Sequence, residues 1–332
     1  MGDRVTQRST EHARITAGGH RPRLLGSRNW RLPDFIVIGA MKAGTTSLFE
    51  YLRAHPQVFM SPLKEMDFFV EERNWPRGMD WYGRRFRRAG SDVVAVGEAS
   101  PSYTKYPEHT GVPERIAAYL PDVKLIYLVR DPIERIRSHY QHRVMVGSEH
   151  APIESAVLRD PTYVDVTRYA VQIERYLNWF PRESILVLTA EELRTQRLAT
   201  MHRVHRFLQI DPDFVAPTID REFYRTDERA SSPFGLWWAR RNLKGFVPRS
   251  TRWWLRRYMN RYIPADQQVQ LSTDPGAARA RWVGGREHTT ASRVALVRVP
   301  EALRAQLIEA LRDDVARLGS YMPEGFDGWG IA

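Results

Sequence analysis

Short runs of consecutive apolar residues alternate along the chain with longer segments in which apolar side chains recur at helical spacing. The runs are typical of strands buried on both faces of a parallel sheet, and they lie at 35–38, 93–97, 125–129 and 185–188. The helical spacing predicts helices at 46–53, 113–120, 132–146, 169–180, 191–208 and 301–318. Strands that alternate with helices predict an α/β fold, a central parallel sheet flanked by helices, with ligands at the carboxyl ends of the strands.

Two segments depart from this alternation. Residues 1–32 are polar, dotted with arginine and without the apolar core of a secretory signal, so we expect a disordered basic leader. Residues 33–332 would then form a single large domain. Within it, residues 229–265 contain no acidic residue and combine arginines with tryptophans, which predicts a basic helical flap or insertion. No run approaches the roughly 18 apolar residues of a transmembrane helix.

The composition narrows the class of protein. At 332 residues and 42% hydrophobic, the chain is long and apolar enough to bury a sizeable core. The lack of cysteine excludes a disulfide-stapled scaffold, a zinc ribbon, an iron–sulfur protein and a thiol nucleophile, and it agrees with a reducing compartment. We therefore expect a cytoplasmic protein, with peripheral contact to the inner membrane face through 229–265 as a further option.

The charge balance points to an acidic partner. The net charge is +11, with a sequence pI of about 10.0. Such a surplus suits nucleic acid, an anionic membrane face, or a ligand that carries phosphate or sulfate. The alternative is an arginine-rich composition with no functional meaning.

The most informative motif follows the first predicted strand, where residues 39–47 read Gly-Ala-Met-Lys-Ala-Gly-Thr-Thr-Ser. Small residues let the backbone turn tightly around an anion, and the amides at a helix N-terminus attract negative charge. Lys42 adds a positive charge, and Thr45 and Thr46 add hydroxyl donors. The nucleoside triphosphatase loop differs, because its lysine follows the second glycine, and so does the Gly-x-Gly-x-x-Gly turn. The alternative is a turn that only joins strand to helix.

A second motif spans residues 128–140. Asp131, followed by Pro132 and by Glu134 three residues after it, is typical of the first turn of a helix. Arg130 is thus expected at a strand end, and Ser138 two turns into the helix. An arginine fork suits two-point contact with phosphate oxygens, although a purely structural helix cap would use the same residues.

These motifs, with His55-Pro56 and Lys-Glu-Met-Asp-Phe-Phe at 64–69, carry a family resemblance. From about residue 33 to 188 the chain resembles sulfotransferases that use 3′-phosphoadenosine 5′-phosphosulfate (PAPS). The similarity is strongest to the carbohydrate-acting branch that includes heparan sulfate sulfotransferases and many bacterial relatives. The resemblance implies transfer of a sulfuryl group from PAPS to a hydroxyl or amine of a carbohydrate or glycolipid-like acceptor. It implies no metal, and no group of residues at metal-ligand spacing stands out in the sequence.

The resemblance also assigns roles to single residues. Lys42 would contact the phosphosulfate group and stabilise the leaving phosphate. The 5′-phosphate would be held by the rest of the loop, Ala43, Gly44, Thr45, Thr46 and Ser47. The 3′-phosphate would be held by Arg130 and Ser138. Tyr169 would lie near the nucleotide or, equally, in the core, and a late loop at 229–233 would close over the nucleotide.

An acceptor that loses its proton during attack requires a positioned base. The resemblance favours Glu65 as this base, with a surface ion pair as the alternative. Glu98 follows the second predicted strand, and we expect it to line the cleft and orient Lys42 or the acceptor. His139 is a further candidate base, or else a packing residue within its helix. Some relatives carry a lysine directly after the glutamate, where this sequence has Ala99, so the handling of the acceptor is expected to differ.

The alternative function is a nucleic-acid-binding or other polyanion-binding module. The charge of +11 and the interleaved arginines and tryptophans of 229–265 would suit a phosphate backbone. That function leaves the ordered pattern of Lys42, Glu65, Arg130 and Ser138 unexplained. A kinase-like phosphotransferase is disfavoured because the lysine is misplaced and no magnesium-binding set is evident. We therefore predict a sulfotransferase without a nucleic-acid partner, with its acceptor and its oligomeric state unspecified by the sequence.

Overall fold

The computed structural model of the chain describes residues 31–223 and 297–332. The predictions for nearly all of the leader at 1–32, for the segment 229–265 and for the loop at 229–233 lie outside the described residues. The described helices include none with the length and apolar character needed to cross a bilayer.

Within the described residues, five strands form one parallel sheet in the order β2-β3-β1-β4-β5. The strands are β1 Phe35–Gly39, β2 Val58–Met60, β3 Ala95–Ala99, β4 Lys124–Val129 and β5 Ile185–Thr189. The predicted α/β fold is therefore confirmed, and β1, β3, β4 and β5 correspond to the four predicted strands. We did not predict β2, because its three residues are too few to show a periodicity.

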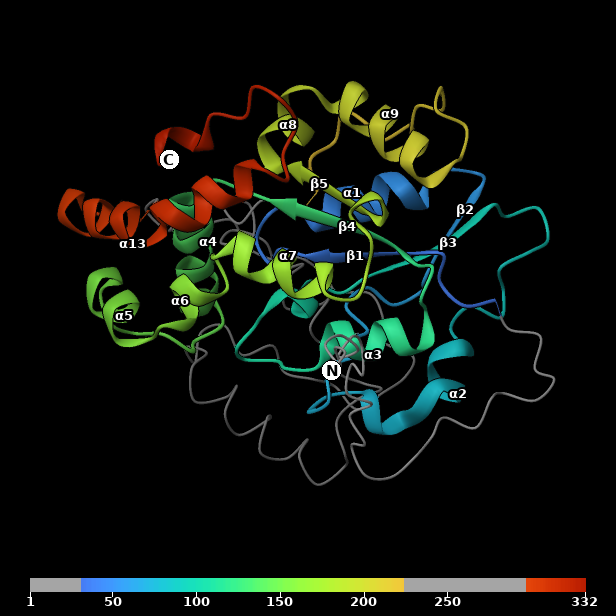
Figure 1. Ribbon diagram of the computed structural model, residues 1–332, viewed down its shortest axis with the longest axis horizontal. Helices are drawn as coiled ribbons and strands as arrows, with labels where there is room; N and C mark the ends of the chain where they lie inside the picture. The colour runs from blue at the N-terminus through green and yellow to red at the C-terminus, as the bar shows by residue number, and fades with distance from the viewer. Residues whose placement is uncertain (1–30, 224–296) are drawn as a thin grey trace, which may run out of the picture.

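Helices cover the sheet on both sides. In Figure 1, α8 and α9 lie above the sheet, and α3 and α7 lie below it. The α-helices are α1 Thr45–Arg53, α2 Gly78–Gly83, α3 Val112–Tyr119, α4 Pro132–Met145, α5 Ile153–Arg159, α6 Thr162–Asp165, α7 Tyr169–Leu177, α8 Ala190–Thr195, α9 Arg197–Leu208 and α13 Glu301–Gly319. The 3-10 helices are η1 Trp75–Arg77, η2 Pro101–Thr104, η3 Arg182–Ser184 and η5 Gly328–Gly330.

The strand order of the sheet reverses at β1. Strands β2 and β3 lie on one side of β1, and β4 and β5 lie on the other. Where the order of a doubly wound sheet reverses in this way, the loops that leave neighbouring strands diverge and open a crevice at their carboxyl ends. The loop between β1 and α1 and the start of α4 both lie at this point.

A second core joins the two described ranges. Besides the main core around the sheet, a separate apolar cluster packs α4, α5 and α6 against α13, with Ile136, Val157 and Leu311 among its members. Asp314 of α13 accepts hydrogen bonds from the amides of Ala170 and Val171, both 3.0 Å, and so caps α7. The C-terminal helix is therefore part of the same fold as the site.

Two predicted helices differ from the structure. The helix expected at 191–208 is two helices, because the backbone leaves helical geometry at Gln196. The first of them, α8, begins earlier because Thr189 and Glu192 form a reciprocal capping box. The helix expected at 169–180 ends at Leu177.

Candidate active site

The loop between β1 and α1 turns on residues with left-handed backbone, at Lys42 (φ 72°) and Gly44 (φ 93°). Where the loop leaves β1, Gly39 passes so close to η2 that a Cβ atom would lie 1.9 Å from the Thr104 hydroxyl oxygen. Gly44 is the N-cap of α1 and supplies no side-chain cap, and the first turn of α1 has no acidic residue. The start of α1 is therefore suited to an anion.

The predicted donors of this loop are unequally exposed. Gly44 is exposed, whereas Lys42 and Thr46 are half-buried at the outer side of the loop. Thr45 is buried, with 4% of its surface exposed. The loop thus presents a lysine, a threonine hydroxyl and the amide end of a helix together.

Two residues predicted to bind the 5′-phosphate are engaged inside the protein instead. Ala43 is fully buried, and its amide donates to the carbonyl of Ala40 (3.1 Å). The Ser47 hydroxyl accepts a hydrogen bond from the amide of Phe223 (3.0 Å) and donates to its carbonyl (3.3 Å). These contacts tie the loop and α1 to the segment after α9.

Arg130 joins this loop from the end of β4. Its Nη1 donates to the carbonyl of Lys42 at 3.2 Å, although the two residues are 88 positions apart. Its Nη2 lies 3.5 Å from a carboxylate oxygen of Glu134, and 26% of the side chain is exposed. Ser138 is buried on α4, two turns further on. The structure therefore brings together the lysine loop and the arginine motif that the sequence analysis paired.

The first turn of α4 confirms the predicted cap. The Asp131 carboxylate accepts hydrogen bonds from the amides of Ile133 (2.8 Å) and Glu134 (3.0 Å), and Pro132 stands at the first helical position. Glu134 pairs with Arg130 and also with the side chain of Arg137. The cap fixes the direction in which Arg130 leaves the strand.

Glu65 lies on the segment that follows β2. Its amide donates to the carbonyl of Ala99, 2.8 Å away at the end of β3, and its backbone is left-handed (φ 61°). The side chain is 56% exposed and contacts the ammonium of Lys64. Burial would raise the pKa of Glu65, but the charge and hydrogen bond of Lys64 outweigh it and lower the pKa below its ordinary value. Glu65 is therefore ionised and accessible at neutral pH.

Glu98 lies in the core, which corrects the prediction that it lines the cleft. It has no exposed surface, since β3 is an inner strand. Its carboxylate accepts hydrogen bonds from the hydroxyls of Tyr82 (2.6 Å), Ser100 (2.8 Å) and Tyr103 (3.0 Å). Burial raises the pKa of Glu98 to about 7, although these hydrogen bonds act in the opposite direction.

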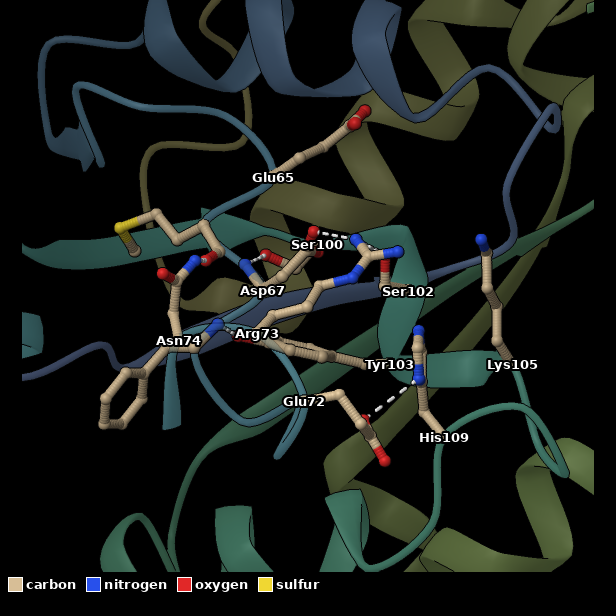
Figure 2. Close-up of polar contacts among 12 residues, drawn as sticks. Glu65, Asp67, Glu72, Arg73, Asn74, Ser100, Ser102, Tyr103, Lys105 and His109 are labelled. Atoms are coloured by element: carbon tan, nitrogen blue, oxygen red, sulfur yellow. Dashed lines mark hydrogen bonds and ion pairs between the residues drawn. The ribbon is translucent and has the colours of Figure 1, made fainter. Parts of the chain in front are cut away.

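The hydroxyls bound to Glu98 also hold the segment that carries Glu65. The Ser100 oxygen accepts the amide of Asp67 (3.1 Å), and the Tyr103 oxygen accepts the amide of Phe68 (3.0 Å) (Figure 2). A hydroxyl has one proton to donate, so a hydroxyl that donates to Glu98 turns its lone pairs toward these amides. Glu98 thereby orients the segment 65–69 without touching the cleft.

Two charged side chains with no predicted role, Arg73 and Lys105, belong to the region around Asp67 and η2, and the charge of Lys105 acts on Glu65. Arg73 pairs with the buried carboxylate of Asp67 and donates to the hydroxyl of Ser102 (3.1 Å). Burial raises the pKa of Asp67 above its ordinary value, with Arg73 opposing the rise. The Lys105 side chain is 13% exposed, and burial lowers its pKa. Figure 2 shows the Glu65 side chain directed away from Asp67, with Arg73 between Asp67 and Ser102.

Two further predicted residues lie in the interior. Tyr169 has no exposed surface, and its ring packs against those of Tyr127 and Trp329 at 6.1 and 6.2 Å between centroids. Of the two roles predicted for Tyr169, the structure agrees with the core. His139 is 6% exposed, and burial together with the charges of Arg135 and Lys105 lowers its pKa to about 2. An imidazole of such low basicity is a poor proton acceptor, which disfavours His139 as the base.

Within residues 31–223 and 297–332, no group of His, Asp and Glu side chains is placed to hold a metal ion. Several donors gather at the end of β1: the lysine, the arginine, the threonine hydroxyl and the start of α1, beside the Glu134 carboxylate that pairs with the arginine. This donor set fits an anionic group such as a phosphate or a sulfate.

Comparisons with known proteins agree with this geometry. Residues 32–229 match the family model described as "Sulfotransferase domain". The human bifunctional heparan sulfate N-deacetylase/N-sulfotransferase 3 is 34% identical over 206 residues, which cover 55% of this chain and 23% of that protein. The human heparan sulfate glucosamine 3-O-sulfotransferase 5 is 31% identical over 196 residues, 55% of each chain.

A solved structure is similar over most of its own length. The crystal structure of a sulfotransferase from Alicyclobacillus acidocaldarius superposes with a TM-score of 0.52 at 30% sequence identity. The superposition covers 62% of this chain and 92% of that one. The curated relatives, by contrast, are matched over about a quarter to a half of their own length.

Proposed function

This chain belongs to the sulfotransferase family, and from that premise we propose that it transfers a sulfuryl group from PAPS to a hydroxyl or amine of a carbohydrate acceptor. When bound, PAPS would supply the sulfuryl group, and the leaving 3′,5′-bisphosphate would take up the negative charge of the broken S–O bond. The residues of this chain would bind, orient and deprotonate the reacting groups.

The donor end of the site consists of the loop after β1 and the arginine at the end of β4. Lys42 would face the 5′-phosphate and stabilise charge as it develops there, and the start of α1 would bind the same group through its amides and Thr46. Arg130 and Ser138 would hold the 3′-phosphate. The observation that supports the proposal is the 3.2 Å contact between Arg130 and the Lys42 carbonyl, since it joins the arginine to the lysine loop.

The acceptor end is built around Glu65. Its carboxylate is exposed and ionised, so it would take the proton from the acceptor hydroxyl or amine as the new bond to sulfur forms. The left-handed backbone at Glu65 (φ 61°) and Asp67 (φ 48°) is a local strain that the Glu98 network holds in place. We therefore assign Glu65 as the base and Glu98 as a positioning residue.

A carbohydrate acceptor is supported by the named activities of the relatives, which act on heparan sulfate. Hydroxyl-rich and acidic sugars would meet Arg73 and Lys105 beside Glu65. The match covers only part of each relative's length. The carbohydrate acceptor of this chain is therefore a proposal and not a property taken over from the relatives.

Nucleotide binding tests the donor. We would titrate the purified chain with 3′-phosphoadenosine 5′-phosphate (PAP), AMP and ATP–magnesium by calorimetry, alongside Lys42→Ala and Arg130→Ala. We expect PAP to bind most tightly and Arg130→Ala to remove most of its advantage over AMP. Arg203→Ala is the control. Arg203 lies on α9 and pairs with Glu192 of α8, and the variant should bind PAP like the unmodified chain. Equal binding of PAP and AMP, or tighter binding of ATP–magnesium, would refute the proposal.

A further inference from the structure

Arg135 is among the largest side chains without any exposed surface, and it lies beneath the loop that follows β1. Its Nε donates to the carbonyl of Met41 at 3.2 Å. Its Nη1 donates to the carbonyl of Tyr163 (3.1 Å) and to the hydroxyl of Thr167 (2.9 Å). The side chain thus joins α4 to the loop, to α6 and to the turn that follows α6.

Within the described residues, no carboxylate forms a hydrogen bond or ion pair with the Arg135 guanidinium. All its hydrogen-bond acceptors within the described chain are neutral oxygens, and its Nη2 is buried without a partner there. Burial lowers the pKa of Arg135 to about 10, so the guanidinium still carries its charge at neutral pH. The charge of Glu108 acts on Arg135 only from a distance. A dehydrated cation that no carboxylate contacts is costly, because it gives up its hydration without a close ion pair. An anion brought to the nearby loop would recover part of that free energy.

The hydrogen bond to Met41 belongs to a pair. Arg135 holds the Met41 carbonyl, and Arg130 holds the next carbonyl, that of Lys42, each at 3.2 Å. Carbonyl oxygens repel an anion and amide groups attract one. Turning two successive carbonyls toward arginines therefore leaves the loop with its donors available to an anionic ligand.

We propose that Arg135 is a positioning residue for the donor, which holds the loop in its anion-binding form through Met41 and adds a buried positive charge beneath the 5′-phosphate. This inference rests on the proposed function, since it assigns the bound group as the 5′-phosphate of the nucleotide. Arg135 acts behind the loop, so its effect reaches the ligand through the backbone and through the electric field.

A purely structural role is the competing explanation, because Arg135 also ties Tyr163 and Thr167 to α4. A matched control exists on the same helix. Arg143 pairs with Asp160 at 2.5 Å and lies 5.1 Å over the ring of Tyr163, so it links α4 to the same neighbouring segment. Its ion-pair partner is Asp160, which lies between α5 and α6 and not in the loop after β1.

The experiment compares the dissociation constants of PAP and AMP for the unmodified chain, Arg135→Met and Arg143→Met, with thermal unfolding followed in parallel. Both nucleotides carry the 5′-phosphate, so Arg135→Met should weaken both by about tenfold or more and leave their ratio within about twofold. Arg130→Ala should instead reduce the preference for PAP over AMP, that is, the dissociation constant of AMP divided by that of PAP. Arg143→Met should lower thermal stability and leave both dissociation constants within about twofold.

Three results would overturn the inference. Arg135→Met could unfold at lower temperature yet bind both nucleotides normally, which would leave only a structural role. It could weaken PAP alone, which would place its effect at the 3′-phosphate. If Arg135→Met does not fold, Arg135→Lys decides, because it keeps the charge without the fork. We expect Arg135→Lys to bind both nucleotides at least about threefold more weakly than the unmodified chain. Unchanged binding by Arg135→Lys would be the third result that overturns the inference. If the unmodified chain does not distinguish PAP from AMP, the proposed function itself fails.

Discussion

Glu98→Gln is the substitution that most directly tests how the buried network works. Glu98 is completely buried, and its pKa of about 7 lies well above the ordinary glutamate value of 4.5. An acid with a raised pKa in the folded state binds its proton more tightly there than in the unfolded state. Its stabilising contribution is therefore complete below the unfolded pKa and is lost as the pH rises through the folded pKa.

The size of the effect follows from the shift. Each pKa unit corresponds to about 1.4 kcal/mol, so ionising Glu98 in the folded protein should cost up to about 3 kcal/mol between pH 4.5 and pH 7.5. Glutamine has nearly the same shape as the protonated acid and does not titrate. We compare the free energy of unfolding of the unmodified chain with that of Glu98→Gln at each pH. The difference should fall by up to about 3 kcal/mol between pH 4.5 and pH 7.5 and should stay constant at higher pH.

The assay is urea unfolding of both proteins at half-unit steps from pH 5 to pH 8.5, analysed by linear extrapolation. All other titrating groups are common to the two proteins, so their difference isolates Glu98. Glu183→Gln, on the exposed η3 helix, serves as the control and should follow the unmodified chain at every pH. A difference between the unmodified chain and Glu98→Gln that stays constant from pH 5 to pH 8.5 would show that Glu98 does not titrate there, and the reasoning would be wrong.

Three other substitutions test the site and the elements that build it. Glu65→Gln should lower kcat by about 100-fold or more in a sulfuryl-transfer assay, because it removes the proposed base, and it should leave PAP affinity within about threefold; a kcat near that of the unmodified chain would rule out Glu65. Gly39→Ala should destabilise the protein by about 1–3 kcal/mol in urea, since its Cβ would lie 1.9 Å from the Thr104 hydroxyl oxygen. The double variant with Thr104→Ala should recover part of that loss, and additive losses would argue against the clash. Asp131→Ala should cost about 1 kcal/mol of unfolding free energy and Asp131→Asn less, because asparagine still caps α4; equal losses for the two would contradict the cap.

The Glu98 network shows why the position of a residue in the sequence did not predict its surroundings. We expected Glu98 directly after a strand at 93–97, and a strand end suggested a cleft residue. Strand β3 instead runs to Ala99, so Glu98 lies within it. The structure puts β3 between β2 and β1, so the side chain is covered on all sides. Its partner Tyr82 comes from α2 and lies 16 residues away along the chain, a contact that no local pattern reports.

The acceptor end was the least predictable part of the site. Glu65 was identified from its motif, but the sequence did not assign Arg73 or Lys105 to its surroundings. Both reach the site because the segment after β2 folds back over η2, where Arg73 meets Asp67 and Ser102. The left-handed backbone at Glu65 is likewise imposed by these contacts, since glutamate seldom adopts it.

Elements whose geometry is a local property of the chain follow from the residues alone. An apolar β-branched run makes a buried strand, glycine permits the turn that follows it, and Asp131-Pro132 starts a helix, because each depends on backbone preferences of a few neighbouring residues. These preferences predicted four of the five described strands, the turn after β1 and the start of α4, whereas the pairing of that turn with Arg130 was implied by the family resemblance. The tertiary structure alone decided which side chains face outward. It turned Ser47 and Tyr169 inward, buried Glu98 and Arg135, and left Glu65 exposed. Burial and partners depend on which distant segments pack together, and the pKa of each group follows from that packing.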